Sequence, residues 1–375
     1  MFPLPPRPLS PDPTKARVEF DLKHTSPLVG VRFDPSGRFL FASTQDNTLQ
    51  RFDLLTGAKV PLAGHESWVR GMAFVGGGGA DEVAAWEAAR TALPAVGGFG
   101  AITPPRPKVR PFALVSGDYG GKLIWWQGDA DSPKPTRVVD AHDGWVRAVA
   151  VSPDSRFVAS CGNDNLVKLW TADGAPVRVL EGHTSHVYNL AFHPAGKRLA
   201  SCDLKGVVKD WDLATGAATR EFDAKVLYKY DPGFMADIGG ARGLSFDASG
   251  TRLAVAGITN VSNAFAGVGN PLVVAFDWAD GKAKQLKPKD AFQGTMWGVA
   301  FHPGGFVIGA GGGSGGRVWF WRGDETTSFH VVNVQPNARD LTLSPTGKRF
   351  AVAGANGSAL VYTFTPGPAP VPAKK

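Results

Sequence analysis

Cysteine is scarce in this chain. Only Cys161 and Cys202 occur among 375 residues, and no Cys-x-x-Cys pair is present. This count excludes a disulfide framework and a four-cysteine zinc site, so reduced thiols are expected. Long apolar runs are missing too, since no stretch approaches the roughly 18 apolar residues of a membrane span. Prolines interrupt the first ten residues, which therefore lack the continuous apolar segment of a signal peptide. We expect a soluble, cytoplasmic protein without a membrane partner.

Charge is also sparse. Charged residues make up 19% of the chain and apolar residues 43%, so the chain can bury a large core and fits neither a disordered protein nor a coiled coil. Forty basic against 33 acidic residues give a net charge of +7, which permits anionic partners but is mild for this length. By contrast, 47 glycines and 29 prolines are about a fifth of the chain and imply many turns.

A short motif recurs along the chain. An apolar strand end is followed by a turn in which proline presets φ and glycine accepts a left-handed conformation, as in Phe33-Asp-Pro-Ser-Gly37, and the turn leads into an alternating strand. Related copies start at Phe33, Phe74, Val151, Phe192, Phe246, Phe301 and Leu343. The regular spacing is about 41 residues, and longer intervals mark insertions. A later strand of each repeat ends in an aromatic residue: Phe52, Trp126, Trp170, Trp211, Phe276, Trp321 and Tyr362.

The repeats resemble WD40 repeats. Gly64-His65, Gly182-His183 and the variant Ala141-His142 each lead to a terminal Trp or Trp-Asp, and the resemblance covers residues 24–364. It implies an all-β, seven-bladed β-propeller of four-stranded antiparallel blades. The seventh repeat lacks its outer strand, whereas residues 16–22 are strand-like and have no other place. We expect this N-terminal strand to pair with the last blade and close the ring.

We therefore predict one propeller domain with irregular additions. The propeller spans 15–365, between a Pro-rich segment at 1–14 and a Pro-rich tail at 366–375. The resemblance puts the first insertion, which contains a short helix near 81–90, on the bottom face, and the other two on the top face as a rim or lid. The insertions are 76–111, 225–240 and 258–270.

The third repeat contains the residue types of a hydrolase triad, His142, Ser160 and Asp164. The WD40 resemblance implies a structural role instead: Asp bonds His, His bonds Ser, and Ser bonds the indole N–H of Trp170. Such a buried network staples a blade, because an unpaired polar group costs about 1 to 3 kcal/mol. Repeats 2 and 4 have Gly120 and Lys205 where Asp is expected, so their networks are predicted to be incomplete.

A glycine-rich stretch, Gly311 to Gly316, formally matches the dinucleotide-binding fingerprint. A strand-like segment follows it instead of the helix that would hold a pyrophosphate, so we expect a turn. No cofactor and no metal site are predicted. The two cysteines share one repeat position in neighbouring repeats and are expected to be small buried residues.

The first strand of each repeat has apolar residues spaced by three and then two, which predicts a β-bulge that turns one extra residue outward. Around the seven repeats this residue is Val29, Arg70, Arg147, Tyr188, Arg242, Trp297 and Arg339. Two places earlier stand Pro27, Trp68, Trp145, His186, Gly240, Thr295 and Asn337. The resemblance implies that both sets surround the channel on the top face. Alternatively, the arginines lie along the channel wall or pair with a neighbour such as Asp340.

These features favour a non-catalytic interaction scaffold. Arginine offers bidentate bonds to carboxylate or phosphate, and aromatic residues bury area at low entropic cost. The predicted top-face binding residues are Arg70, Arg147, Arg242, Arg339, Trp68, Trp145, His186, Tyr188 and Trp297. The expected partner is an acidic or phosphorylated segment of another protein, bound by a monomeric propeller within a larger complex.

Two other functions remain open. A propeller hydrolase or lactonase would need metal-ligating groups in the channel, which a cationic ring disfavours. A nucleic-acid binder would draw on the net charge and on basic residues at 106–110, and its binding would fall steeply with salt.

Overall fold

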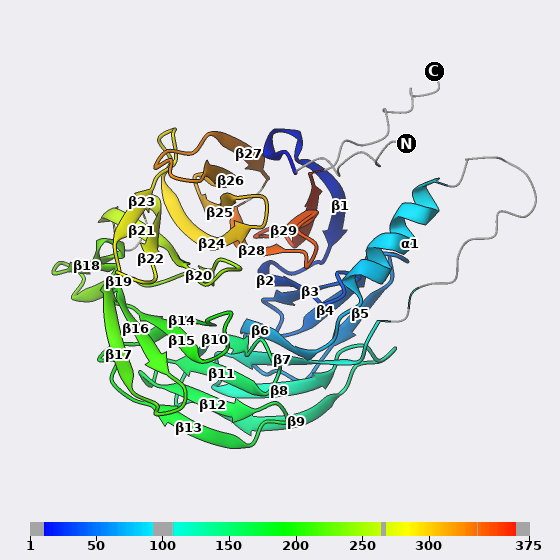
Figure 1. The fold of residues 1–375 in the computed structure, drawn as a ribbon, viewed down its shortest axis with the longest axis horizontal. Helices are drawn as coiled ribbons and strands as arrows, with labels where there is room; N and C mark the ends of the chain where they lie inside the picture. Colours follow the sequence, from blue (N-terminus) through cyan, green and yellow to red (C-terminus); the bar gives the residue numbers. More distant parts are fainter. Residues whose placement is uncertain (1–10, 93–106, 108, 264–267, 336, 365–375) are drawn as a thin grey trace, which may run out of the picture.

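The computed structural model describes residues 11–92, 107, 109–263, 268–335 and 337–364. Within them, seven four-stranded antiparallel sheets stand in a ring (Figure 1). The predicted all-β propeller with seven blades is confirmed. We call the top face the side on which the chain passes from the outer strand of one blade to the first strand of the next.

The blades follow one another in chain order. Blade 1 is β2 (Leu28–Phe33), β3 (Phe39–Thr44), β4 (Leu49–Asp53) and β5 (Lys59–Leu62); blade 2 is β6 (Val69–Gly76), β7 (Phe112–Asp118), β8 (Lys122–Gln127) and β9 (Pro135–Asp140). Blade 3 is β10 (Val146–Val151), β11 (Phe157–Gly162), β12 (Val167–Thr171) and β13 (Pro176–Leu180); blade 4 is β14 (Val187–Phe192), β15 (Arg198–Asp203), β16 (Val207–Asp212) and β17 (Ala218–Asp223).

Blade 5 is β20 (Gly243–Phe246), β21 (Arg252–Asn263), β22 (Val268–Asp277) and β23 (Ala283–Leu286); blade 6 is β24 (Gly294–His302), β25 (Phe306–Gly313), β26 (Gly315–Arg322) and β27 (His330–Val334). Blade 7 is β28 (Ala338–Leu343), β29 (Arg349–Gly354) and β30 (Ser358–Thr363), completed by β1 (Arg17–Lys23). The glycine-rich stretch of blade 6 forms the β25–β26 hairpin, with Gly312 opposite Gly316, so the predicted turn is confirmed.

The N-terminal strand closes the ring, as predicted. β1 runs antiparallel to β30, from Arg17 opposite Thr363 to Lys23 opposite Ser358. A bidentate ion pair fastens it to β29, because Arg349 donates from Nε and Nη2 to the two carboxylate oxygens of Glu19, each at 2.7 Å. The first and last strands therefore share one sheet.

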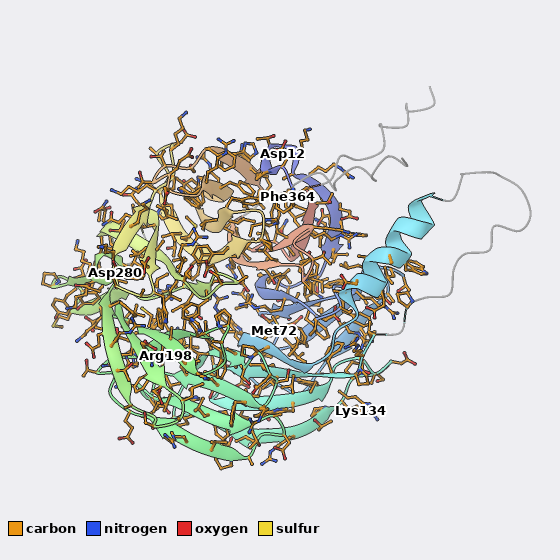
Figure 2. All side chains as sticks on the ribbon, viewed as in Figure 1. Asp12, Met72, Lys134, Arg198, Asp280 and Phe364 are labelled. Carbon is orange, nitrogen blue, oxygen red and sulfur yellow. The ribbon has the colours of Figure 1, made fainter. Side chains whose placement is uncertain are left out.

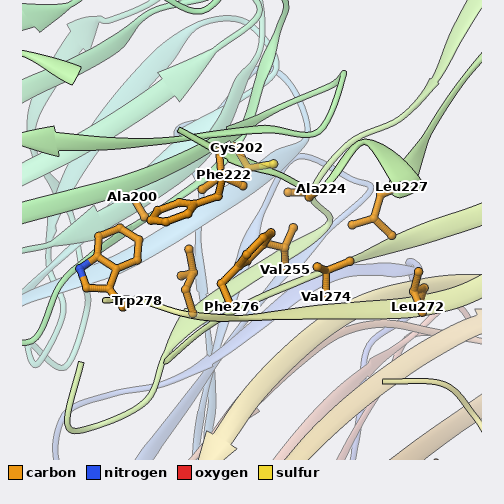
Figure 3. Close-up of a cluster of buried hydrophobic side chains, with 13 residues drawn as sticks. Ala200, Cys202, Phe222, Ala224, Leu227, Val255, Leu272, Val274, Phe276 and Trp278 are labelled. Atoms are coloured by element: carbon orange, nitrogen blue, oxygen red, sulfur yellow. The ribbon is translucent and has the colours of Figure 1, made fainter. Parts of the chain in front are cut away.

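The core lies between neighbouring blades. One cluster joins Cys202 and Val208 of blade 4 to Val255, Val274 and Phe276 of blade 5 (Figure 3). Comparable clusters fill other blade interfaces, where Trp126, Trp211, Trp319 and Trp321 are almost fully buried. Each blade thus buries both faces of its sheet against its neighbours, and the ring excludes water without disulfides.

The insertions leave the ring at the expected places. α1 (Ala80–Ala92) follows β6, and Val83 and Trp86 pack on Leu55 of blade 1. The predicted short helix is thus confirmed. Before blade 5, η2 (Lys225–Leu227) leads into the hairpin of β18 (Tyr228–Asp231) and β19 (Ala236–Gly239). Lys229 Nζ donates to the carbonyl of Val261 on β21 at 2.7 Å, so the two blade-5 insertions contact each other on the top face. No helix in the described part of the chain is long and apolar enough to cross a membrane.

The predicted bulges are present in the first strands of six blades. The register shifts by one residue at the start of each strand, and the extra residues are Val29, Arg70, Arg147, Tyr188, Trp297 and Arg339. In blade 5 the corresponding Arg242 directly precedes β20, and its amide donates to the carbonyl of Ala256 at 2.8 Å. The innermost strands carry these residues. Figure 2 shows one of the strands with Met72 of β6 near the centre of the ring.

Candidate functional site

The four triad-like residues of blade 3 form one buried network. His142 Nδ1 lies 2.8 Å from Asp164 Oδ1, and His142 Nε2 lies 2.7 Å from Ser160 Oγ. Trp170 Nε1 donates to the same Ser160 oxygen at 2.9 Å. The His142 side chain has no exposed area. The serine oxygen is therefore held by an imidazole and an indole inside the blade, where a substrate has no access.

Two further blades carry complete networks, and our expectation that they would be incomplete was wrong. In blade 2, His65 lies 2.7 Å from both Asp118 Oδ2 and Ser116 Oγ, and Trp126 donates to Ser116 at 2.8 Å. In blade 4 the corresponding group is His183, Asp203, Ser201 and Trp211. In both blades the aspartate stands two residues after the serine rather than four. Its second oxygen accepts backbone N–H groups of the following turn, as Asp118 Oδ1 does from Gly120 at 2.9 Å.

Blade 1 has lost part of this network. His24 Nε2 lies 2.6 Å from Asp46 Oδ2, but the terminal aromatic residue is Phe52, which has no N–H to donate. Ser43, shifted by one place, points to the other side of the sheet, and its buried Oγ has no hydrogen-bond partner. Ser43 shares its register position with Cys161 and Cys202. Both cysteines are buried free thiols, and burial raises the pKa of each.

The bulge residues of blades 3, 4 and 5 form a stack at the top end of the central channel. We call this end, where Arg70, Arg147, Tyr188 and Arg242 lie, the channel mouth. Tyr188 lies between two guanidinium groups, with Arg147 Cζ 4.2 Å and Arg242 Cζ 4.7 Å from the ring centroid. Arg147 also lies 4.4 Å from the ring centroid of Trp145, and Arg242 lies 5.2 Å from that of Trp297. These five residues come from four successive blades, so closure of the ring creates the stack.

A tyrosine that the sequence reasoning missed extends the stack. Tyr119 lies in the turn between β7 and β8, and its ring stacks on Trp145 with centroids 4.0 Å apart and planes 4° apart. The Trp68 ring also contacts Tyr119, with centroids 6.2 Å apart and planes tilted by 40°. Both tryptophans are 40% exposed. Turn residues carry no periodicity, so the sequence held no signal for Tyr119 beyond its aromatic character.

Hydrogen bonds fix two of the predicted residues to one loop. Arg147 Nε donates to Asn163 Oδ1 at 2.7 Å, and His186 Nδ1 lies 2.6 Å from the Asn163 carbonyl oxygen. Asn163 belongs to the turn after β11 and was not among the predicted site residues. Asn163 therefore fixes the positions of Arg147 of blade 3 and His186 of blade 4 relative to each other.

Arg70 crosses the channel. From blade 2 its Nη1 donates to the Val29 carbonyl of blade 1 at 2.9 Å, and its Nη2 reaches the Arg242 carbonyl of blade 5 at 3.5 Å. Burial lowers the pKa of Arg242, and the nearby Arg147 and Arg70 lower it further. Burial and Arg70 likewise lower the pKa of Arg339. The four predicted arginines therefore interact electrostatically around one axis.

Below the mouth lies a cavity of about 270 Å³, lined among others by Arg32, Arg70, Arg147, Arg242 and Asn189. No carboxylate is among its described lining residues. The nearby Asp340 is buried and forms an ion pair with Arg32, and it also accepts the backbone N–H of Val31 at 3.0 Å and of Leu341 at 2.9 Å. The alternative that Asp340 neutralises the ring arginines is not what the structure shows, because its ion-pair partner is Arg32 of blade 1. Within the described residues, no three His, Cys, Asp or Glu side chains group as metal ligands would.

Comparison with known proteins agrees with this architecture. The family model for the WD domain, G-beta repeat, matches residues 18–53, 133–171 and 174–212. Each matched stretch begins on or just before an outer strand and ends on the third strand of the next blade, which is the offset that ring closure requires. The three matched stretches are therefore similar to WD40 repeats, and they lie in a seven-bladed β-propeller.

A relative matches over a short stretch. Sixty residues are 33% identical to the DDB1- and CUL4-associated factor 13 of Dictyostelium discoideum. The aligned stretch covers 16% of this chain and 13% of that protein, so the chain spans a small part of its length.

Proposed function

We propose that this protein is a non-catalytic protein-interaction scaffold whose top face binds an acidic or phosphorylated segment of a partner protein. The observation that carries the proposal is the convergence of Arg70, Arg147, Arg242 and Arg339 from four blades on one channel mouth. Guanidinium groups form charge-assisted, often bidentate bonds with carboxylate and phosphate groups. The relative's printed name, an associated factor, is in keeping with a role in protein assembly.

The aromatic residues supply the apolar part of the surface. Trp68 and Trp145 are each 40% exposed at the rim, whereas Tyr188 and Trp297 are partly buried and support the arginines. Rigid aromatic groups beside arginines are the composition of binding hot spots. We expect the partner segment to cross the rim over the exposed indoles with its negative charge directed to the axis.

The buried Ser–His–Asp groups support a stapling role rather than hydrolysis. The same constellation recurs in blades 2, 3 and 4, and in each the serine oxygen accepts an indole N–H. A hydrolase needs one accessible nucleophile. We therefore place binding at the channel mouth and stability in the blades.

The test replaces the four arginines together by glutamine. Crosslinking and mass spectrometry in the native cell should show loss of the partners that the wild type retains. The matched control is Arg156→Gln, because Arg156 is an exposed arginine that also stacks on a ring, that of Phe157, but at a turn on the opposite face. Unchanged capture by the fourfold variant would move the site away from the mouth.

A further inference from the structure

We infer that the channel mouth is a site for one phosphomonoester dianion held by Arg70, Arg147 and Arg242, so that the partner is recognised through a phosphorylated side chain rather than a run of carboxylates. This inference rests on the proposed function and narrows it. Four features of the mouth support it. Guanidinium N–H groups are available to donate, no carboxylate lies among the described lining residues, Arg70 crosses the channel, and two exposed indoles lie beside the mouth.

The stacked geometry leaves donors free. In Arg147 and Arg242 the guanidinium carbon lies over aromatic rings, a contact that uses the π face and leaves the in-plane N–H groups available. Arg147 uses its Nε on Asn163. The Nε of Arg242 is buried and has no hydrogen-bond partner. An unsatisfied buried donor on a charged group is costly, so the hydrogen-bonding capacity of this guanidinium group is not fully used.

The charge around the site is uncompensated. Arg70, Arg147 and Arg242 approach one another without a carboxylate among the described lining residues, since Asp340 is engaged by Arg32. Burial lowers the pKa of Arg242, and the charges of Arg147 and Arg70 lower it further. A phosphomonoester carries a charge of about −1.5 to −2 and three acceptor oxygens. One such group can contact three guanidinium groups at once, whereas one carboxylate has one charge and two oxygens.

Arg70 gives the site a floor. Its hydrogen bonds to the Val29 and Arg242 carbonyls run from one side of the channel to the other, and Arg32 lines the cavity as well. The cavity of about 270 Å³ is many times the ~30 Å³ share of one water molecule. It is therefore large enough for a phosphate group, and we expect one ligand per propeller.

The exposed aromatic residues beside the mouth favour a phosphorylated peptide as the ligand. The half-exposed indoles of Trp68 and Trp145 flank the mouth, and such groups bury main-chain and apolar side-chain area at low entropic cost. A lipid headgroup or a free phosphate ester shares the same chemistry. The experiment therefore includes both as separate arms.

Binding is measured by calorimetry with three short peptides of glycine and alanine that differ only in a central phosphoserine, serine or glutamate. We expect the phosphoserine peptide to bind at least about tenfold more tightly than the glutamate peptide, because charge-assisted bidentate bonds form to more oxygens. Inorganic phosphate should compete with it. Its affinity should rise between about pH 5 and pH 7 as the second phosphate proton leaves, with pKa near 6.

The variants assign the site. Arg242→Gln and, separately, Arg147→Gln should weaken the phosphoserine peptide at least about tenfold, whereas Arg156→Gln on the opposite face should not change it. Thermal transitions of all three variants establish that they are folded, and two independent mouth variants keep the result interpretable if one of them is not.

Several outcomes would overturn the inference. Equal affinity for the phosphoserine and glutamate peptides would remove the phosphate requirement and leave the scaffold proposal standing. Binding to vesicles that contain a phosphorylated inositol lipid, without binding to the peptide, would assign the mouth to a membrane instead. If no peptide binds and the fourfold glutamine variant still captures the cellular partners, the mouth fails as the site and the proposed function fails with it.

Discussion

Ser43 and Ser160 show how one hydroxyl can stabilise or destabilise a blade. Ser160 Oγ contacts both His142 and Trp170 inside blade 3. Ser43 Oγ is equally buried in blade 1 but has no partner, because it faces the side of the sheet where blades 3 and 4 carry a cysteine. Removing a satisfied group and removing an orphaned one should therefore have opposite effects.

We expect Ser43→Ala to raise the free energy of unfolding by about 1 kcal/mol and Ser160→Ala to lower it by about 1 to 3 kcal/mol. The first substitution removes the desolvation penalty of a hydroxyl that has no partner. The second leaves the His142 ring nitrogen and the Trp170 indole N–H without their hydrogen-bond partner. Chemical denaturation of both variants against wild type tests this. A loss of stability in Ser43→Ala comparable to that in Ser160→Ala would show that Ser43 has a role that its contacts do not reveal.

His302 should make stability depend on pH. Its Nδ1 accepts the N–H of Gly304 at 2.8 Å, its Nε2 donates to the Gly347 carbonyl at 2.7 Å, and burial lowers its pKa from 6.5. The folded protein therefore holds a neutral ring where the unfolded chain already binds a proton. The contribution of the neutral His302 ring to the free energy of unfolding is complete above pH 6.5. It is lost as the pH falls through the folded-state pKa of His302. Thermal unfolding from about pH 7.5 down to pH 5 should thus decline less steeply in His302→Gln than in wild type. The same decline of the unfolding temperature with pH in both proteins would contradict this prediction.

At the scale of elements, β1 determines whether blade 7 is complete. It pairs with β30 along its length, and Phe20 and Leu22 pack on the core between blades 7 and 1. Deleting residues 1–23 should lower the free energy of unfolding by about 3 kcal/mol or more, because apolar area and a full ladder of hydrogen bonds are lost and an edge is exposed. A synthetic peptide of residues 15–24 added to the deleted protein should restore part of the thermal transition. If the deletion leaves the transition unchanged, closure by β1 contributes no stability.

Elements also show what sequence can predict and what it cannot. The bulge at Arg147 followed from apolar spacing alone, because strand side chains alternate with a period of two and any break must be absorbed. The place of β1 followed from a repeat that lacked its fourth strand. The aspartates of blades 2 and 4 were missed because positions two and four after the serine both border the same turn, and only the backbone path decides which one reaches the histidine. The contact of Arg70 with the carbonyl of Arg242 joins opposite blades, and no local pattern encodes it.

At the scale of the whole molecule, the four mouth arginines lower the stability of the unliganded protein and provide its affinity for an anion. The four cations converge on one axis because the ring closes, and their mutual repulsion is present whenever the mouth is empty. Inorganic phosphate at ten times its dissociation constant should therefore stabilise the wild type by about 1.4 kcal/mol. The fourfold glutamine variant should show no such gain in a thermal shift measurement at constant ionic strength. A gain of equal size in both proteins would place the anion elsewhere on the surface.

The pairing of β1 with β30 also has a consequence in time. Glu19 of β1 and Arg349 of β29, which form an ion pair in the same sheet, are separated by 330 positions. The ribosome must therefore release β30 before β1 can pair with it, and until then the ring of blades stays open at one place. Such long-range closure is slow and leaves an unpaired border that invites other chains. Assembly of the propeller is accordingly most vulnerable in the interval before β30 is available to β1.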